Sequence, residues 1–380
     1  MGKQIPVTPS VISWARSRAG FSLEEAALKF KRIAAWEDPD DDAAPTYAQL
    51  EAMAEAFKVP VAVFFFPAPP DVPTVEETFR TMPEAALEAI EPRIKLLLRK
   101  AKVLQLNLIE LGGGRNPAPR LITRDLRFPL GIAADVMAAR VRDYLDVPLE
   151  EQIAWPNPET ALERWRSRFN AVGVSVFKDQ FRSPRFAGFC LTHEEFPLIY
   201  VNNTAPKTRQ IFTLFHELAH LMFHTSGVDF RRDEDAPAFR ADGRRIEVLC
   251  NRFAGVLLVP DDAFLAAMAG QPANAETARA LAQRFNVSSL VIFRKMLDHN
   301  MIDAARYRSA HDAAAEERET GSGGSFYNNH MAYLGRSYVG LVLAAYHQHR
   351  ISEVAVADYL LTNPRNVPGL EERFLKSAAA

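Results

Sequence analysis

The sequence predicts a predominantly helical α+β protein. Apolar residues recur at helical spacing through residues 9–66, 84–111 and 132–171, whereas the period shortens to that of strands from Val172 to Val201. Helical spacing then returns and continues towards the end of the chain. One short strand-rich stretch between long helical ones predicts a single small sheet, which we expect to be antiparallel.

Composition favours a globular protein with an ample core. The chain has 380 residues, of which 48% are hydrophobic and 24% charged, a length that suggests two or three domains. A net charge of −2 provides no overall field that would draw the protein to nucleic acid or an anionic membrane. Its two cysteines, Cys190 and Cys250, suit a reducing compartment. Residues 1–10 lack the apolar core of a signal peptide, and the apolar run Val59 to Phe66 is too short to span a bilayer, so we expect a cytoplasmic protein.

The first two hundred residues are expected to fold into helices and then strands. Short helices are predicted within 9–66, one of them after a capping box formed by Ser22 and Glu25. A proline-rich connector, Pro67 to Pro83, precedes a long helix. That helix runs from Glu84 to Leu111 and stops at three glycines. The strands of the sheet are expected at Val174–Phe177, Arg185–Leu191 and Leu198–Val201.

Residues 216–220 read His-Glu-Leu-Ala-His inside an apolar run. Residues four apart lie on one face of a helix, so His216 and His220 can bind one metal ion and Glu217 can reach a water held on it. The competing interpretation is a buried helix with two satisfied core histidines. A carboxylate further along the chain favours the metal site.

That carboxylate is Glu247, at the margin of the apolar face of a predicted helix within Arg244 to Pro260. A half-buried carboxylate is costly unless it is paired or bound to metal, so Glu247 is the predicted third ligand; an ordinary surface glutamate is the alternative. Asn251, one turn on, is a candidate to orient a ligand. Cys250 is the rival ligand, although a buried cysteine is more often a small apolar residue.

Three segments together resemble the ImmA/IrrE family of metallo-endopeptidases: Pro197 to Asn202, Arg209 to His220, and Glu247 to Pro260. The resemblance implies a zincin-like core with a gluzincin-like site, in which His216, His220 and Glu247 bind Zn²⁺, or another divalent transition metal such as Mn²⁺, and Glu217 is the catalytic base. His224 extends the four-residue series but lies about 80° further round the helix from His216. We expect it to support the ligands or the structure.

The N-terminal pattern resembles the XRE-type helix-turn-helix that is fused to many ImmA/IrrE proteins, with Trp36-Glu37 and Pro45-Thr46 among its landmarks. Only five residues separate Phe30 from Trp36, too few for a full recognition helix. The acidic loop Asp38 to Asp42 would face phosphate unfavourably. We expect weak DNA binding at most, or a fold kept for dimerisation or partner docking. The basic residues available for phosphate are Arg16, Arg18, Lys29, Lys31 and Arg32.

The remaining chain completes four predicted regions. Short helices are expected at Ala278–Phe285 and Val291–His299, and a linker, Gly321 to Ser325, precedes a helical unit from Tyr327 to Leu375. The regions are 1–70, helix-turn-helix-like with a shortened recognition helix; 71–150, connector and helical spacer; 151–310, zincin-like metallopeptidase core; and 311–380, linker and C-terminal helical interaction unit.

The resemblance implies a zinc-dependent regulatory endopeptidase that cleaves a specific intracellular partner protein, such as a repressor; the chain could also form a homodimer. Glu217 would take a proton from the attacking water and deliver it to the leaving amine. The alternative is a transcriptional regulator or antitoxin of a two-gene module, with a toxin from a neighbouring gene as partner and a structural or sensing site. Glu217 favours the peptidase, because a purely structural site needs no general base. Candidates to stabilise the oxyanion are Tyr200, His224, Tyr307 and Tyr327.

Overall fold

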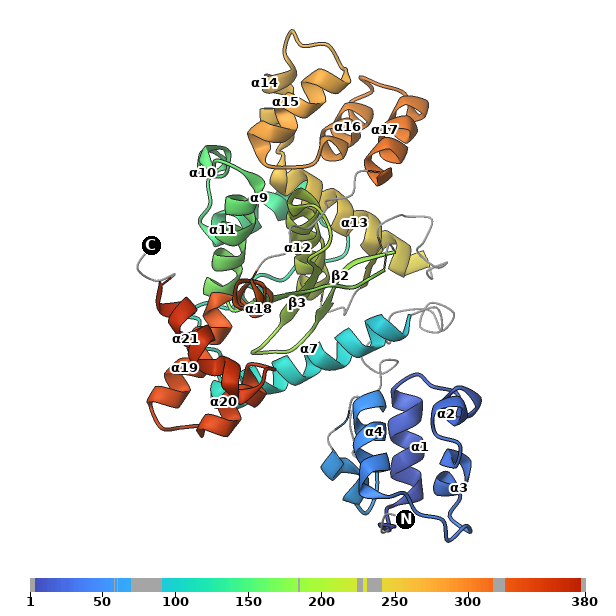
Figure 1. The fold of residues 1–380 in the computed structure, drawn as a ribbon. Helices are drawn as coiled ribbons and strands as arrows, with labels where there is room; N and C mark the ends of the chain where they lie inside the picture. Colours follow the sequence, from blue (N-terminus) through green and yellow to red (C-terminus); the bar gives the residue numbers. More distant parts are fainter. Residues whose placement is uncertain are drawn as a thin grey trace. The chain divides into compact units, whose positions relative to one another are not determined.

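The computed structural model describes residues 4–57, 59, 61–69, 91–183, 185–223, 228–230, 241–316 and 325–376. Over these residues the protein is predominantly helical with one small sheet, which confirms the predicted fold class (Figure 1). The described residues up to Lys100 form one compact unit, and those from Ala101 onward form a second. Among the described helices, none has both the length and the apolar character needed to cross a membrane.

The N-terminal unit is a cluster of short helices around its own apolar core. The predicted capping box is present: the backbone N–H of Glu25 donates to Ser22 Oγ at 3.1 Å, and that of Ser22 donates to Glu25 Oε2 at 2.8 Å. Val11, Leu50 and Phe57 are among the core residues with no exposed surface. The elements are α1 (Pro9–Arg18), α2 (Leu23–Lys29), α3 (Ile33–Glu37), α4 (Tyr47–Phe57) and the 3₁₀ helix η1 (Val61–Phe65).

Arg16 ties α1 to α3 inside this unit. Its Nε and Nη2 donate to the two carboxylate oxygens of Glu37 at 2.7 and 2.9 Å, and its Nη1 donates to the carbonyl of Phe21 at 2.8 Å. This bidentate pair is the strong form of an Arg–carboxylate contact. Arg16, predicted from the sequence as a phosphate contact, is therefore held by an internal ion pair.

The long predicted helix is α7 (Pro92–Leu111); the part of the prediction between residues 84 and 90 lies outside the described residues. It ends at the glycines as expected. Gly113 and Gly114 have φ angles of +60° and +79°, and their N–H groups bond back to the carbonyls of Glu110 and Ile109. Glycine adopts this left-handed conformation without the steric cost of a side chain, which is why the helix stops here.

Among the described residues, the sheet has four strands in the order β1-β3-β2-β4. The strand β2 pairs antiparallel with both β3 and β4, but β1 pairs parallel with β3. The expected wholly antiparallel sheet is therefore wrong in one pairing, and the sheet is mixed. The strands are β1 (Ser175–Asp179), β2 (Phe186–Leu191), β3 (Leu198–Asn202) and β4 (Val228–Phe230).

Asn202, at the end of β3, hydrogen-bonds residues on both sides of the connection between β1 and β2. Its Oδ1 accepts from the N–H of Phe181 at 3.3 Å, and its Nδ2 donates to the carbonyl of Phe186 at 3.0 Å. The N–H of Asn203 donates to the carbonyl of Asp179 at 2.8 Å. Asn202 is fully buried, and its amide links the connection between β1 and β2 to the end of β3, which lies between these two strands in the sheet.

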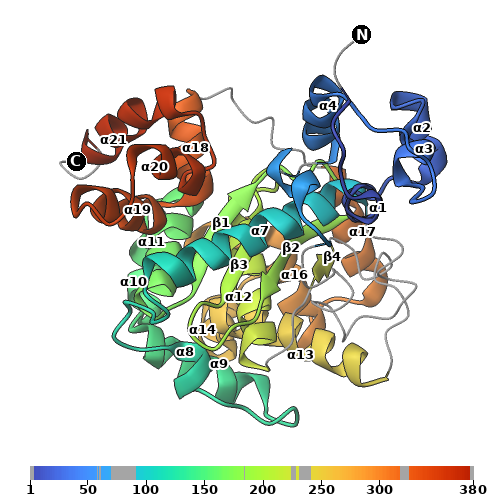
Figure 2. The ribbon, with the colours of Figure 1, turned by 90° about the horizontal axis from the view of Figure 1, so that it is seen from below.

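Helices cover both faces of this sheet. The helix α12 (Lys207–Met222) packs on one face, and the end of α7 crosses the other, as the two views show together (Figures 1 and 2). On the α7 face, Gln105 is fully buried, and its side-chain amide nitrogen Nε2 donates to the carbonyl of Phe196 at 3.0 Å. The other helices between α7 and residue 316 are α8 (Ile122–Asp125), α9 (Ala134–Leu145), α10 (Leu149–Ala154), α11 (Pro158–Ala171), α13 (Ala241–Leu258), α14 (Asp261–Met268), α15 (Ala275–Phe285), α16 (Ser289–Asp298) and α17 (Ala304–Glu316).

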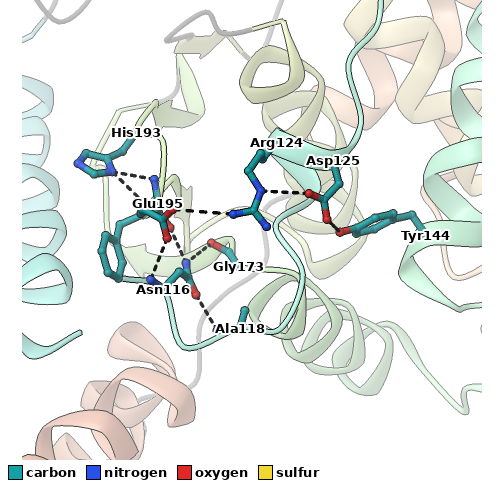
Figure 3. A network of polar contacts seen from close by, with 9 residues as sticks. Asn116, Ala118, Arg124, Asp125, Tyr144, Gly173, His193 and Glu195 are labelled. Atoms are coloured by element: carbon teal, nitrogen blue, oxygen red, sulfur yellow. Dashed lines mark hydrogen bonds and ion pairs between the residues drawn. The ribbon is translucent and has the colours of Figure 1, made fainter. Parts of the chain in front are cut away.

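A polar network anchors the turn between β2 and β3 (Figure 3). His193 Nδ1 accepts from the backbone N–H groups of Glu195 and Phe196, both at 3.1 Å. The Glu195 carboxylate accepts from the N–H of Asn116 at 3.0 Å and lies 3.9 Å from Arg124. These contacts hold the turn between β2 and β3 against the segment between α7 and α8. They thereby fix the end of the β2–β3 pair at which this turn lies.

The C-terminal helices pack on the sheet of their own chain. The ring of Tyr338 meets that of Phe177 on β1 edge-to-face, with centroids 5.3 Å apart, and its hydroxyl donates to the carbonyl of Tyr359. The buried Arg166 on α11 donates to the carbonyls of Ala332 and Val176, both at 3.0 Å. The C-terminal helical unit, which the sequence predicts as an interaction unit, therefore uses one face to pack against the core of its own chain. Its helices are α18 (Phe326–Leu334), α19 (Arg336–His347), α20 (Glu353–Tyr359) and α21 (Val367–Lys376).

Candidate metal centre

The helix α12 is buried around almost its whole circumference, so its polar side chains need partners inside the protein. Phe215 fixes it against α11: its ring packs edge-to-face on Trp165 at 4.8 Å between centroids and on Phe169 at 5.3 Å. Such aromatic pairs have defined geometry as well as a large buried area. They set the rotation of α12, and with it the direction in which the neighbouring His216 points.

His216 and His220 lie one turn apart on α12 and face α13, which supplies Glu247. The Nε2 atoms of the two histidines are 3.1 Å apart. Glu247 places Oε2 at 3.3 Å from His216 Nε2 and Oε1 at 3.1 Å from His220 Nε2. The histidines are 1% and 3% exposed, whereas the Glu247 side chain retains 22% of its exposure. The structure thus brings together the three residues that the sequence predicted as ligands.

Asn251 lies behind His216. Its Oδ1 is 3.1 Å from His216 Nδ1, so an N–H on Nδ1 would donate to this oxygen and leave Nε2 with its lone pair. A hydrogen bond of this kind on the far nitrogen orients a histidine ligand. Cys250, the rival ligand, is fully buried and hydrogen-bonds His220. It is not one of the three residues whose ligand atoms group together.

Burial and charge act in opposite directions on these groups. Burial alone would raise the pKa of the Glu247 carboxyl, but the charge of His220 and hydrogen bonds from both histidines hold that pKa well below its usual range. Burial opposes the charged form of His220, yet Cys250 and Glu247 raise its pKa well above the ordinary value. Burial raises the pKa of the Cys250 thiol. The carboxylate is therefore held in the ionised form that a metal ligand requires.

Glu217 lies on α12 between the two histidines. It has no exposed surface, and its Cγ lies 3.8 Å from the position that a Cβ on Gly188 of β2 would occupy. The Cγ of Glu217 therefore lies close to β2, and its carboxylate is near enough to Cys250 of α13 to raise the pKa of that thiol beyond the effect of burial. Gly188 was missed from the sequence, although a lone glycine inside an apolar strand is a signal for a close approach of backbone to its neighbours.

The other predicted candidates are not gathered here. Tyr200 stacks on Phe189 at 5.1 Å between centroids, on the sheet face opposite α12, which excludes it as an oxyanion group. Tyr327 packs against Gly369 among the C-terminal helices. Tyr307 on α17 lies near Arg294, whose guanidinium carbon is 5.9 Å from the ring centroid. His224 lies outside the described residues.

The donor set fits a divalent transition metal. Two imidazole nitrogens and a carboxylate are one of the usual zinc sets, with ligand distances of about 2.0–2.1 Å, which place ligand atoms about 3.3 Å apart in a tetrahedral site. The two Nε2 atoms are 3.1 Å apart, and each lies 3.1–3.3 Å from one of the two Glu247 oxygens, which is close to that spacing. Within the described part of the chain, no other group of three such side chains has this arrangement.

The buried helix carries His-Glu-x-x-His and packs between a small sheet and a second helix that supplies a glutamate. This arrangement defines a zincin-like metallopeptidase core. The comparison with protein families agrees: residues 169–297 match the model of the IrrE N-terminal-like domain, Peptidase_M78. This match supports the predicted resemblance to the ImmA/IrrE family and a divalent metal as cofactor. The N-terminal helix-turn-helix resemblance stays a prediction. The comparison with curated proteins found no match.

Proposed function

We propose that this chain is a zinc-dependent endopeptidase that cleaves one partner protein rather than degrading proteins generally. The observation that carries the proposal is the convergence of the Nε2 atoms of two histidines and the two carboxylate oxygens of Glu247, with contacts of 3.1–3.3 Å, beside a buried glutamate on the histidine helix. A site of only structural importance would have no use for Glu217. The match over residues 169–297 supports the same class of activity.

His216, His220 and Glu247 would hold Zn²⁺, which would polarise the peptide carbonyl and acidify a water molecule. Glu217 takes a proton from the attacking water and passes it to the leaving amine. Asn251 orients the ring of His216 through Nδ1. Burial of Glu217 keeps bulk water away from the carboxylate, so the proton passes between reacting groups.

Limited access to the site supports a selective enzyme. Of the three ligand side chains, only that of Glu247 retains substantial exposure, so an extended segment of the substrate must reach the site from the side of α13. A partner such as a DNA-binding repressor, with a cleavable segment of this kind, fits the regulatory role implied by the family resemblance. The regulator or antitoxin alternative gains no support of its own from the site.

The test is to incubate the metal-loaded protein with the product of the neighbouring gene and, in parallel, with a proteome-derived peptide library. Mass spectrometry then identifies new peptide termini. We expect cleavage by the wild type, and a loss of roughly 10²–10⁴-fold in rate for Glu217→Gln, because the isosteric amide cannot accept the proton.

Metal content and thermal unfolding supply the control for this variant. Both should stay close to wild type in Glu217→Gln, since the proposed role of Glu217 is not that of a ligand. A Glu217→Gln protein that cleaves as fast as wild type would contradict the proposed base. A Glu217→Gln strain with a wild-type phenotype, beside a His220→Ala strain without one, would favour a structural or sensing site.

A further inference from the structure

The strand β2 lies close to α12 at Gly188. A Cβ at this position would lie 2.4 Å from Thr213 Cγ2 and 3.0 Å from the carbonyl oxygen of Tyr200. The first distance is shorter than the non-bonded contacts that Cβ atoms make in real structures. The backbone φ of Gly188 is one that other residues also adopt, so backbone conformation does not require glycine here. The closeness of α12 to β2 does require it.

The contact involves the same face of α12 that carries Glu217. Thr213 and Glu217 are four residues apart, so they lie one above the other on the helix. Both meet β2 at Gly188, and Glu217 Cγ is 3.8 Å from the site of the absent Cβ. Thr213, like Glu217, has no exposed surface. A side chain at 188 that displaced Thr213 would therefore displace Glu217 with it.

The ligands depend on a different contact. The ring nitrogens of His216 and His220 contact Glu247 and Asn251 of α13. A shift of α12 away from β2 would change the place of Glu217 relative to the strand, while the ligand contacts with α13 could move together with the helix. Metal binding thus depends on contacts with α13, whereas Glu217 also has a close contact with β2.

We propose that Gly188 is a positioning residue, which sets the distance between α12 and β2 and so places Glu217 for proton transfer. The catalytic part of this inference rests on the proposed peptidase function; the packing part does not. The atom that transmits the effect is the Cγ2 methyl of Thr213, which serine lacks.

The experiment compares wild type, Gly188→Ala, Thr213→Ser and the double variant Gly188→Ala/Thr213→Ser. The probe is the best-cleaved peptide of the proteome-derived library. We expect kcat to fall on the order of 10–100-fold in Gly188→Ala, since a misplacement of about 1 Å has an effect of this size. KM and metal content should change little, and removal of the methyl in the double variant should restore most of kcat.

Gly131→Ala is the matched control, because a Cβ at Gly131 meets no atom within 4 Å; it should retain full activity. Wild-type kcat in Gly188→Ala would overturn the proposal, and so would a loss that Thr213→Ser does not relieve. If Gly188→Ala alone does not fold, the kcat of the double variant is compared with that of Thr213→Ser. Equal kcat values support the proposal. A kcat that is tenfold lower in the double variant overturns it.

Crystal structures of the same variants separate this inference from the proposed function. A wild type that cleaves nothing would overturn the peptidase proposal alone. Displacement of Glu217 relative to His216 and His220 in Gly188→Ala, reversed in the double variant, would still support the packing role. An α12 that superimposes on wild type in all four proteins would overturn it.

Discussion

The metal centre and the N-terminal unit both carry sequence patterns with a known use, but they treat their polar residues differently. On α12, His216, Glu217 and His220 are almost fully buried, and the two histidines meet Glu247 of α13. In the N-terminal unit, Arg16 forms an internal ion pair with Glu37, and the acidic loop from Asp38 to Asp42 is largely exposed.

The difference shows which polar residues carry functional information. Burial of a charged or strongly polar group is costly unless a partner offsets it, so a group of them converging inside a protein demands an explanation such as a metal. Exposed charges cost little and can persist without a role. A five-residue α3 with exposed acidic neighbours is accordingly weaker support for DNA binding than three converging ligands are for metal binding.

The largest effect should come from removal of the ligands. Purified wild-type protein should carry about one transition metal per chain, and His216→Ala/His220→Ala should carry almost none, because the lone carboxylate left behind binds weakly. Elemental analysis after dialysis measures this. Stoichiometric metal that persists in the double variant would rule out this site.

A smaller effect should follow from Asn251→Ala. Loss of the partner of His216 Nδ1 frees the ring to rotate, and changes of this kind typically lower metal affinity about 10–100-fold. Competition with a chromogenic chelator gives the affinity. Arg252→Ala, exposed on the same helix, is the control and should bind metal as wild type does. Equal affinities for both variants would show that Asn251 does not orient the ligand.

Buried charge outside the metal centre extends the comparison. Burial lowers the pKa of Lys178 to about 8, below its unfolded value of about 10.4. Between these pH values the unfolded chain binds more protons than the folded one, so the free energy of unfolding should rise with pH. Lys178→Met should remove a rise of roughly 2–3 kcal/mol.

Urea unfolding at pH 7.5 and pH 10 measures this change. Lys376→Met provides the control, because Lys376 is largely exposed and should leave the pH dependence as it is in the wild type. Parallel pH profiles for Lys178→Met and wild type would show that the amine is not held in the unfavourable environment that the structure indicates.

The smallest effect is expected in the N-terminal unit. With Arg16 paired, the exposed cations left for phosphate include Lys31 and Arg32. Binding to DNA should then be salt-sensitive, with dissociation constants in the non-specific range of about 10⁻⁴–10⁻⁶ M. Lys31→Glu/Arg32→Glu should weaken it a few-fold in fluorescence anisotropy. Nanomolar binding of a defined operator at physiological salt would contradict this.

Local patterns allowed much of this protein to be predicted from its sequence. The spacing of His216 and His220 places them on one helix face whatever the rest of the fold, because four residues make about one turn. The three strand segments of β1 to β3 followed from their period of two and agree with the structure to within one or two residues. The stop of α7 followed from the conformational freedom of its glycines.

The tertiary structure alone decided which distant surfaces meet. Convergence of Glu247 on the histidines depends on the packing of α12 against α13, and no local pattern specifies that contact. Alternation along β3 puts Tyr200 and Ile199 on opposite faces, but only packing shows that Ile199 faces α12. The parallel pairing of β1 and the close approach at Gly188 were hidden for the same reason: both arise from contacts between segments far apart in the chain, whose energies depend on shape complementarity in the folded core.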